Sequence, residues 1–549
     1  MIKRLTPYIV LVSACTILLL NWQCRQYSNK PHRPKLVIGI VVDQMRFDYL
    51  YKYYNKWSSG GFKRLLQEGF SFEDAEYNYV PTYTAPGHTS IYTGTTPAVH
   101  GMVGNDWFDR GLNRMVYCTE DTAVKTVGSP SDKGMMSPRR NLAETIGDEL
   151  KLSDNGQSKV IGIALKDRAA ILPAGHFANA AYWFDDATGY WITSSYYMKT
   201  IPEWVKKFND EQHTNKYLAQ QWNTMLPIAS YIESSTDTTP YERPFIGEKL
   251  PIFPHNLPEL KHRNGGYGLI KATPFGDDIT AEFAIAAIQN ERLGKGTMTD
   301  MLTISFSSTD YVGHQFGTDA VETEDTYLRL DKNINDLLSF LDSYIGKENV
   351  VIFLTADHGA AMNAKYLEDH NIPAGYVDEN VLVSAEKTDL NKKYGMDPIL
   401  QFANLQFYLD KEKITKNGLN IDSVEEEVAS VAMEFKGVER AIPVYRLSAF
   451  NKDFITNKII NGFNPSRSGD VILNLLPNYL DYDTTGTTHG APYIYDAHVP
   501  LIFYGGLIHH GTSDKEENIT NIAPTISTLL YIPFPDGCTG SPMQEAMKR

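Results

Sequence analysis

The chain has 549 residues, of which 51 are Lys or Arg and 66 are Asp or Glu, so its formal net charge is -15. This acidic balance, without a long basic run, argues against a broad surface for a phosphate backbone, and nucleic acid is not an expected partner. The length exceeds one typical domain but suits a large α/β sheet that carries insertions. An aromatic content of 12% indicates a folded protein rather than a disordered one.

The N-terminus predicts an export signal. Two basic residues precede an apolar run over residues 8–20, which is too short to cross a bilayer comfortably. We therefore expect a signal peptide within residues 1–24, with its cleavage site left open, and a periplasmic or secreted bacterial protein without stable membrane insertion. Cys15 follows a lipobox-like Val-Ser-Ala and Cys24 does not, so a lipid anchor is the less favoured alternative.

Cysteines are scarce in the remaining chain. After signal cleavage only Cys118 and Cys538 certainly remain, which excludes a disulfide framework and a cysteine-based metal cluster. One disulfide between these two residues stays open.

The first predicted strand covers residues 35–42, whose unbroken apolar run is typical of a strand buried on both faces of a parallel sheet. It ends in Asp43, at the edge where open α/β sheets place functional residues, although a helix cap is an equal alternative. A helix is expected near residues 61–68. Thr84 then precedes a proline turn and a helix whose free N–H groups suit an anion; an ordinary capping Thr is the alternative. Asn105 lies in a Gly-rich loop, where a simple turn role is its default interpretation.

A second buried strand is predicted over residues 158–165, after a helix over residues 141–152. It ends in Lys166 and Arg168. Residues two apart on an extended backbone face the same way, so we expect both cations to project together toward an anion, unless they form a surface ion pair. From about residue 182 to 267 the strand and helix rhythm is lost, which indicates an inserted cap region.

The chain returns to the sheet with a helix over residues 278–292 and a strand over residues 301–306. Asp310 and His314 follow. Four residues apart on a helical turn, they lie on one face and suit a metal, although this spacing alone is a weak signal.

The next strand supplies a more specific pair. A long helix over residues 322–344 precedes a strand over residues 349–354, and Asp357 and His358 stand just beyond it. Their alternative is a capping Asp beside an incidental His. A second insertion is expected over about residues 366–477, because this stretch lacks the strand-and-acid pattern.

The last predicted site residue is His489, in a flexible loop over residues 484–491. A strand over residues 499–504 and a helix over residues 518–530 close the domain. The acids and histidines at these strand ends are six metal-ligand candidates, too many for one catalytic zinc and enough for two ions. Zn²⁺ suits carboxylate and imidazole ligands, with Mn²⁺ or Fe as alternatives. Two ions about 4 Å apart can hold both the attacking and the leaving oxygen of a displacement at phosphorus.

Four motifs in this order resemble the alkaline phosphatase superfamily. They are Thr-Ala-Pro-Gly-His at residues 84–88, Asp-x-x-x-His at 310–314, Asp-His-Gly at 357–359 and Thr-His-Gly at 488–490. They most resemble the bacterial PafA-type alkaline phosphatases with threonine nucleophiles, from about residue 35 to the end. The resemblance implies a central, mostly parallel sheet flanked by helices, with inserted cap regions. It also implies a monomeric enzyme that hydrolyses small phosphate monoesters through a phosphothreonine on Thr84 and holds two Zn²⁺.

The resemblance further implies a role for each site residue. Asp310, His314 and His489 would hold one zinc, and Asp43, Asp357, His358 and the Thr84 oxygen the other. Asn105, Lys166 and Arg168 match positions that contact phosphoryl oxygens, and Lys166 would stand where dimeric enteric-type phosphatases hold magnesium.

The same three residues bear on substrate class. A monoester is a dianion, so two extra cations and an amide donor favour it over a diester. The alternative is a phosphodiesterase or nucleotide pyrophosphatase, a branch that lacks the Lys-x-Arg pair. A binding protein without catalysis is disfavoured because Thr84 and all six ligand candidates are intact.

Overall fold

The computed structural model describes residues 33–447 and 453–548. The expected signal peptide over residues 1–24, with Cys15 and Cys24, lies outside the described residues. Within them, no helix has the length and apolar character that crossing a membrane requires. Cys118 and Cys538 are both free thiols, so the disulfide that the sequence left open does not form.

Ten strands of the described chain form one sheet, in the order β21-β2-β20-β13-β1-β12-β7-β8-β9-β6. In that order they span Gly511–Ser513, Phe70–Phe72, Leu501–Gly505, Val350–Thr355, Leu36–Val42, Asp300–Phe306, Val160–Ala164, Ala180–Asp185, Tyr190–Ser194 and Thr126–Val127. The five strands from β13 to β8 run parallel, and antiparallel pairs flank them. The expected α/β fold with a mostly parallel central sheet is therefore confirmed.

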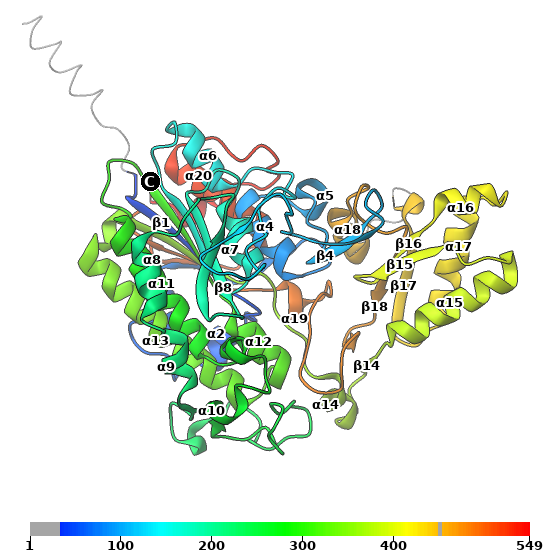
Figure 1. The fold of residues 1–549 in the computed structure, drawn as a ribbon, viewed down its shortest axis with the longest axis horizontal. Helices are drawn as coiled ribbons and strands as arrows, with labels where there is room; N and C mark the ends of the chain where they lie inside the picture. The colour runs from blue at the N-terminus through cyan, green and yellow to red at the C-terminus, as the bar shows by residue number, and fades with distance from the viewer. Residues whose placement is uncertain (1–32, 448–452, 549) are drawn as a thin grey trace, which may run out of the picture.

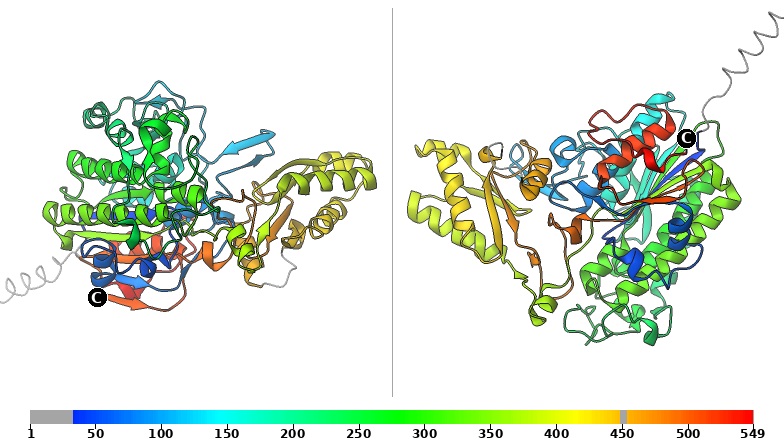
Figure 2. Two further views of the ribbon diagram at one scale, coloured as in Figure 1. Left: turned by 90° about the horizontal axis from the view of Figure 1, so that it is seen from below. Right: turned by 180° about the vertical axis from the view of Figure 1, so that it is seen from behind.

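Helices cover both faces of this sheet (Figures 1 and 2). One layer contains α4 (Thr84–Thr93), α6 (Ile146–Ser153), α7 (Asp167–Ala174) and α20 (Ile522–Leu530), which pack on one another. The other contains α11 (Phe275–Glu291), α12 (Ser308–Phe316) and α13 (Val321–Tyr344). Strands β1, β12 and β13 are buried along their whole lengths, as their unbroken apolar runs predict.

Several predicted boundaries differ from the structure, and two of the differences have a clear cause. The helix predicted from residue 141 begins at Ile146, because Thr145 and Asp148 form a capping box that fixes its start. Strands β8 and β9 join the main sheet although they lie at the beginning of the range expected as the first insertion. Strand β9 pairs antiparallel with both β8 and β6. The regular alternation of strand and helix on which the prediction relied is therefore absent here.

A separate lobe lies within the range expected as the second insertion. We call residues 378–447 and 453–475 the lobe; it projects from the main sheet in Figure 1. Its sheet has the order β15-β16-β18-β17, with strands Ile399–Ala403, Gln406–Leu409, Val471–Leu475 and Val438–Pro443. Helices α15 (Glu379–Tyr394), α16 (Lys411–Lys416) and α17 (Ile421–Ala432) pack on this sheet around a hydrophobic core of the lobe's own. The chain enters and leaves the lobe through β14 (Gly375–Tyr376) and β19 (Tyr479–Leu480), which pair in parallel.

Candidate active site

The strand ends bring the predicted residues to one edge of the sheet. Asp43 directly follows β1, and Asp357 and His358 follow β13. Asp310 lies in the first turn of α12, which follows β12, and Lys166 lies two residues beyond β7. Because these strands are parallel neighbours, their carboxyl ends meet, and the functional side chains converge there.

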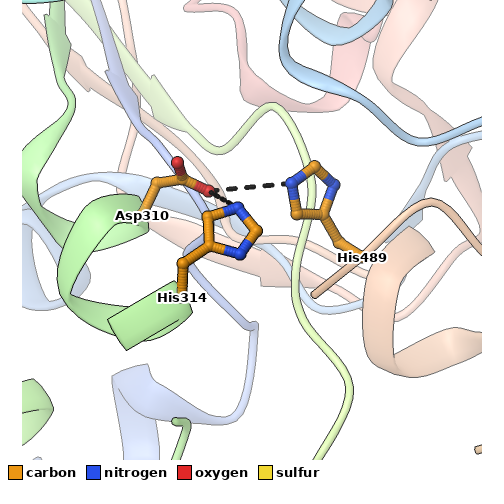
Figure 3. A group of neighbouring side chains, drawn as sticks. All are labelled: Asp310, His314 and His489. Atoms are coloured by element: carbon orange, nitrogen blue, oxygen red, sulfur yellow. Dashed lines mark ion pairs between the residues drawn. The ribbon is translucent and has the colours of Figure 1, made fainter. Parts of the chain in front are cut away.

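One group of potential metal ligands consists of Asp310, His314 and His489 (Figure 3). The Asp310 Oδ1 atom lies 3.2 Å from His314 Nε2 and 3.7 Å from His489 Nε2. The first contact follows from the spacing of four residues on α12. The second brings in the loop after the lobe. This group is the one that the resemblance implies for a zinc ion.

A second group consists of Asp43, Asp310 and His358. His358 Nε2 lies 3.6 Å from Asp43 Oδ1 and 3.5 Å from Asp357 Oδ2. The resemblance implies Asp357, rather than Asp310, as a ligand of the second site. Asp357 lies beside this group, since it contacts His358. The two groups therefore share Asp310 and form one continuous cluster of ligand atoms.

Backbone carbonyls orient all three histidines. The pairs are His314 with Thr487 at 2.8 Å, His358 with Gly359 at 2.9 Å and His489 with Thr82 at 2.7 Å, each through Nδ1. A carbonyl oxygen only accepts, so Nδ1 carries the hydrogen in each ring. The lone pair of Nε2 is thereby directed at the carboxylates, which is the arrangement of metal-binding histidines.

The cluster contains buried polar atoms that protein groups do not satisfy. Asp43 Oδ1, Asp357 Oδ2 and His358 Nε2 have no hydrogen-bond partner among the described residues. An unsatisfied buried polar atom is costly, and a cation between these atoms would satisfy all of them. Carboxylates and imidazoles without thiolate form a donor set for zinc. The residues therefore fit metal ions.

The carboxylates of the cluster differ in proton affinity. Burial and the neighbouring Asp357 carboxylate raise the pKa of Asp43 well above its usual range. Burial acts the same way on Asp310, but His314 and Lys166 outweigh it and hold the pKa of Asp310 well below its usual range. Burial and the neighbouring carboxylates thus disfavour the ionised form of Asp43, which a nearby cation would stabilise.

Lys166 joins the two ligand groups to Thr84. Its Nζ donates to Asp43 Oδ2 at 2.7 Å and to Asp310 Oδ2 at 2.6 Å, and it lies 3.5 Å from Thr84 Oγ1. Burial favours the neutral amine, but the carboxylates of Asp310 and Asp43 raise the pKa of Lys166 above its usual value. Lys166 is therefore a buried ammonium group beside the candidate nucleophile.

Thr84 is the first residue of α4, and its side chain is almost fully buried. The next backbone amide, Ala85 N–H, donates to Asn105 Oδ1 at 2.9 Å. Because Oδ1 accepts this bond, the other end of the Asn105 amide is its NH₂ group, which is a donor. The Gly-rich loop thus places an amide donor at the start of the helix that carries Thr84.

Arg168 reaches this region differently from the prediction. The expected extended strand ends at Ala164, Lys166 caps α7, and Arg168 lies in the first turn of that helix. Lys166 and Arg168 therefore do not lie on one side of a single extended strand. Arg168 Nη1 donates to Tyr117 OH at 3.0 Å, and its buried Nε has no hydrogen-bond partner within residues 33–447 and 453–548. The unpartnered N–H is suited to an anion.

Two contributing residues, Gln44 and His88, were not predicted from the sequence. Gln44 adopts a left-handed backbone (φ 65°), so that its N–H donates to Asp357 Oδ1 at 3.2 Å and its side chain to Asp310 Oδ1 at 2.8 Å. His88 is buried between the Thr84 carbonyl, 2.9 Å from its Nδ1, and Ser305 Oγ, 2.9 Å from its Nε2. Its position inside the Thr-Ala-Pro-Gly-His motif was the available clue.

Comparison with known proteins identifies clear relatives. The family model "Type I phosphodiesterase / nucleotide pyrophosphatase" matches residues 37–493. The protein named calcium-transporting ATPase from Myroides odoratus is 47% identical over 95% of this chain and 96% of its own. Alkaline phosphatase PhoV from Synechococcus elongatus is 45% identical over 94% of this chain and 93% of its own. The crystal structure of wild-type alkaline phosphatase PafA has a TM-score of 0.92 and 42% identity, covering 95% of this chain and 100% of that one.

The close approach of α4 to the end of β13 yields a prediction. A Cβ on Gly87 would lie 2.3 Å from the Asp357 carbonyl oxygen and 2.8 Å from Asp357 Cβ. We therefore expect Gly87→Ala to lower the free energy of unfolding by about 1–3 kcal/mol, and to lower turnover by displacing Asp357. The measurements are urea unfolding and steady-state kinetics.

The control is Gly296→Ala, because the nearest atom to a Cβ there is Met298 N at 3.9 Å. We expect its free energy of unfolding to change by less than about 0.5 kcal/mol. Equal effects of the two substitutions would contradict a specific contact at Gly87.

Proposed function

The chain belongs to the alkaline phosphatase superfamily, in its PafA-type branch, and we propose that it hydrolyses phosphate monoesters through a phosphothreonine on Thr84 with two bound Zn²⁺. The observation that carries this proposal is the position of Lys166, which contacts carboxylates of both ligand groups and lies beside Thr84 Oγ1. A nucleophile, a cation and metal ligands meet at one point.

The metal ligands have a defined place in this chemistry. Two Zn²⁺, held by Asp310, His314 and His489 and by Asp43, Asp357 and His358, would lower the pKa of a hydroxyl and stabilise a leaving alkoxide. The protein supplies the geometry through the carbonyls that orient the histidines and through Gln44, which contacts both Asp310 and Asp357.

The chain's own residues carry the phosphoryl transfer. Thr84 gives up its hydroxyl proton and its Oγ1 attacks phosphorus; the bond from phosphorus to the ester oxygen breaks, and that oxygen takes up a proton and leaves as the alcohol. Water then cleaves the phosphothreonine, releasing inorganic phosphate and restoring the Thr84 hydroxyl. The Lys166 ammonium, the Asn105 amide and the Arg168 guanidinium donate to the phosphoryl oxygens, whose negative charge persists in the transition state.

Charge balance supports a monoester as substrate. The proposed metal ligands and phosphoryl contacts include three carboxylates (Asp43, Asp310 and Asp357) and two cationic side chains (Lys166 and Arg168), of which Lys166 bonds to Asp43 and Asp310. Two divalent cations and an ionised Thr84 would leave the site with two positive charges. A monoester dianion neutralises both charges, whereas a diester monoanion leaves one uncompensated.

The second candidate is diester hydrolysis, which the description of the matching family model favours. The two functions are separated by comparing kcat/KM for a phosphate monoester and a methyl phosphate diester that share one aryl leaving group. We expect the monoester to be preferred. A preference for the diester would overturn the proposal.

We extend the proposal to location and assembly. The basic and apolar N-terminal segment supports export to the periplasm or the medium. The resemblance to PafA-type enzymes supports a monomer.

A first prediction concerns the nucleophile. Thr84→Ala removes the attacking oxygen and leaves every imidazole and carboxylate ligand in place, so we expect turnover to fall by roughly 10³-fold or more. Zinc content, measured by mass spectrometry, should remain near that of the unmodified protein. The control is Thr93→Ala in the same helix; the Thr93 hydroxyl donates to the Thr89 carbonyl. A Thr84→Ala variant with full turnover would contradict the mechanism.

A second prediction concerns charge recognition. Arg168→Ala removes a donor to the phosphoryl oxygens, so we expect kcat/KM for the monoester to fall by roughly 10²-fold. The diester, which carries less charge, should lose less than about tenfold. The matched control is Arg64→Ala, which removes a surface ion pair with Asp342. Equal losses on both substrates would show that Arg168 does not distinguish charge.

A third prediction concerns metal removal. Chelation should abolish turnover and lower the thermal unfolding temperature, because the carboxylates of the cluster would then repel one another without their cations. Added Zn²⁺ should restore both quantities, whereas Mg²⁺ alone should not. Full activity in protein shown by elemental analysis to be metal-free would exclude the proposed chemistry.

A further inference from the structure

One hairpin of the main body supports two of the proposed phosphoryl contacts. It consists of β4 (Asp106–Asp109) and β5 (Arg114–Tyr117), which pair antiparallel. Asn105 directly precedes β4, and its carbonyl accepts from Cys118 N–H at 2.9 Å, across the base of the hairpin. Tyr117, at the end of β5, accepts the hydrogen bond from Arg168 and donates to Asp167 Oδ1 at 2.5 Å. The position of this hairpin therefore bears on both Asn105 and Arg168.

The lobe packs against this hairpin. Phe108, Ala403 and Tyr408 form one small buried cluster. The Phe108 and Tyr408 rings pack edge to face, with their centroids 5.6 Å apart. Arg110 Nη2 bonds to the buried Asp470 carboxylate at 2.8 Å. Figure 1 shows β4 beside β15 and β16, and Figure 2 shows the hairpin extending toward the lobe. These contacts join the inserted lobe to the element that carries Asn105.

The turn between β15 and β16 also contacts the hairpin directly. Asn404 and Leu405 both adopt left-handed backbone conformations, with φ of 54° and 57°. Asn tolerates this conformation, but it is uncommon for Leu, so tertiary contacts must hold the turn. Asn404 Nδ2 donates to the Asp106 carbonyl at 2.7 Å. A Cβ on Gly104 would lie 2.5 Å from the same Nδ2. Asn404 thus contacts the residues on both sides of Asn105.

We propose that the lobe positions Asn105 for phosphoryl binding through the side chain of Asn404, and so contributes to the preference for monoesters. The inference rests on the proposed function of Asn105. Asn105 is bonded through Oδ1 to the amide that follows Thr84, so a shift of residues 104–106 moves its NH₂ group relative to the nucleophile. Asn404 touches no reacting atom and is a positioning residue. Its loss weakens one of the three proposed contacts to the phosphoryl oxygens.

The test is the substitution Asn404→Gly. Glycine adopts φ > 0 freely, so the turn between β15 and β16 keeps its conformation and loses the side-chain donor to the Asp106 carbonyl. We expect kcat/KM for the monoester to fall by about fivefold, the diester with the same leaving group to change by less than about twofold, and the ratio of the two to fall accordingly. Asn404→Asp, which also tolerates this backbone but cannot donate, should reproduce the loss.

The matched control is Asn478→Gly. Asn478 is also left-handed (φ 64°), and its Nδ2 also donates to a backbone carbonyl, that of Pro373 at 3.4 Å. We expect this variant to keep the substrate ratio of the unmodified enzyme. Thermal unfolding of all variants checks that the lobe remains folded.

A double-mutant cycle separates this inference from the function on which it rests. Asn105→Ala should itself lower monoester turnover, and Asn404→Gly should then cause little further loss, because the positioned group is gone. Additive losses, or an unchanged ratio in Asn404→Gly, would overturn the inference while the function stands. If Asn105→Ala leaves monoester turnover unchanged, the proposed role of Asn105 itself is wrong.

Discussion

The ammonium group of Lys166 between Asp43 and Asp310 is the interaction on which the rest of the site depends. Moving a single ion into a protein interior costs several kcal/mol, so none of these groups is stable there alone. Lys166 offsets part of the repulsion between carboxylates that arrive from two strands, β1 and β12. The negative charge that remains makes the cluster suitable for metal cations. One lysine therefore links the stability of the sheet edge to its chemistry.

The sequence predicted the parallel sheet, and the predicted acids and histidines lie together at its edge, for one physical reason. Strands buried on both faces are unbroken apolar runs, and Asp43 and Asp357 stand where such runs stop, so both the core and its functional edge leave local signals. The conformation around Arg168 could not be inferred this way, because the strand gives way to a helix within three residues. Gln44 was also missed, since its role depends on a left-handed backbone that no periodicity reveals.

The lobe marks a different limit of sequence reasoning. Its residues were recognised as an insertion only because they lack the pattern of the main sheet, and that criterion says nothing of contacts. The approach of Asn404 to Asp106 joins segments about three hundred residues apart in the chain, through a turn whose Leu405 conformation opposes local preference. Local and global preferences disagree there, which is common where a segment serves function.

The pairing of β14 with β19 bears on how the lobe can change in evolution. Because the chain leaves the main body and returns to it at adjacent positions, the lobe is a cassette whose replacement breaks no hydrogen bond of the ten-stranded sheet. Sequence drift inside the lobe leaves the strands of that sheet paired, but the lobe residues that contact the hairpin, such as Asn404 and Asp470, stay constrained. A lineage could therefore diversify most of this module, while its contacts to the hairpin, the cluster of potential metal ligands and the supporting strands stay as they are.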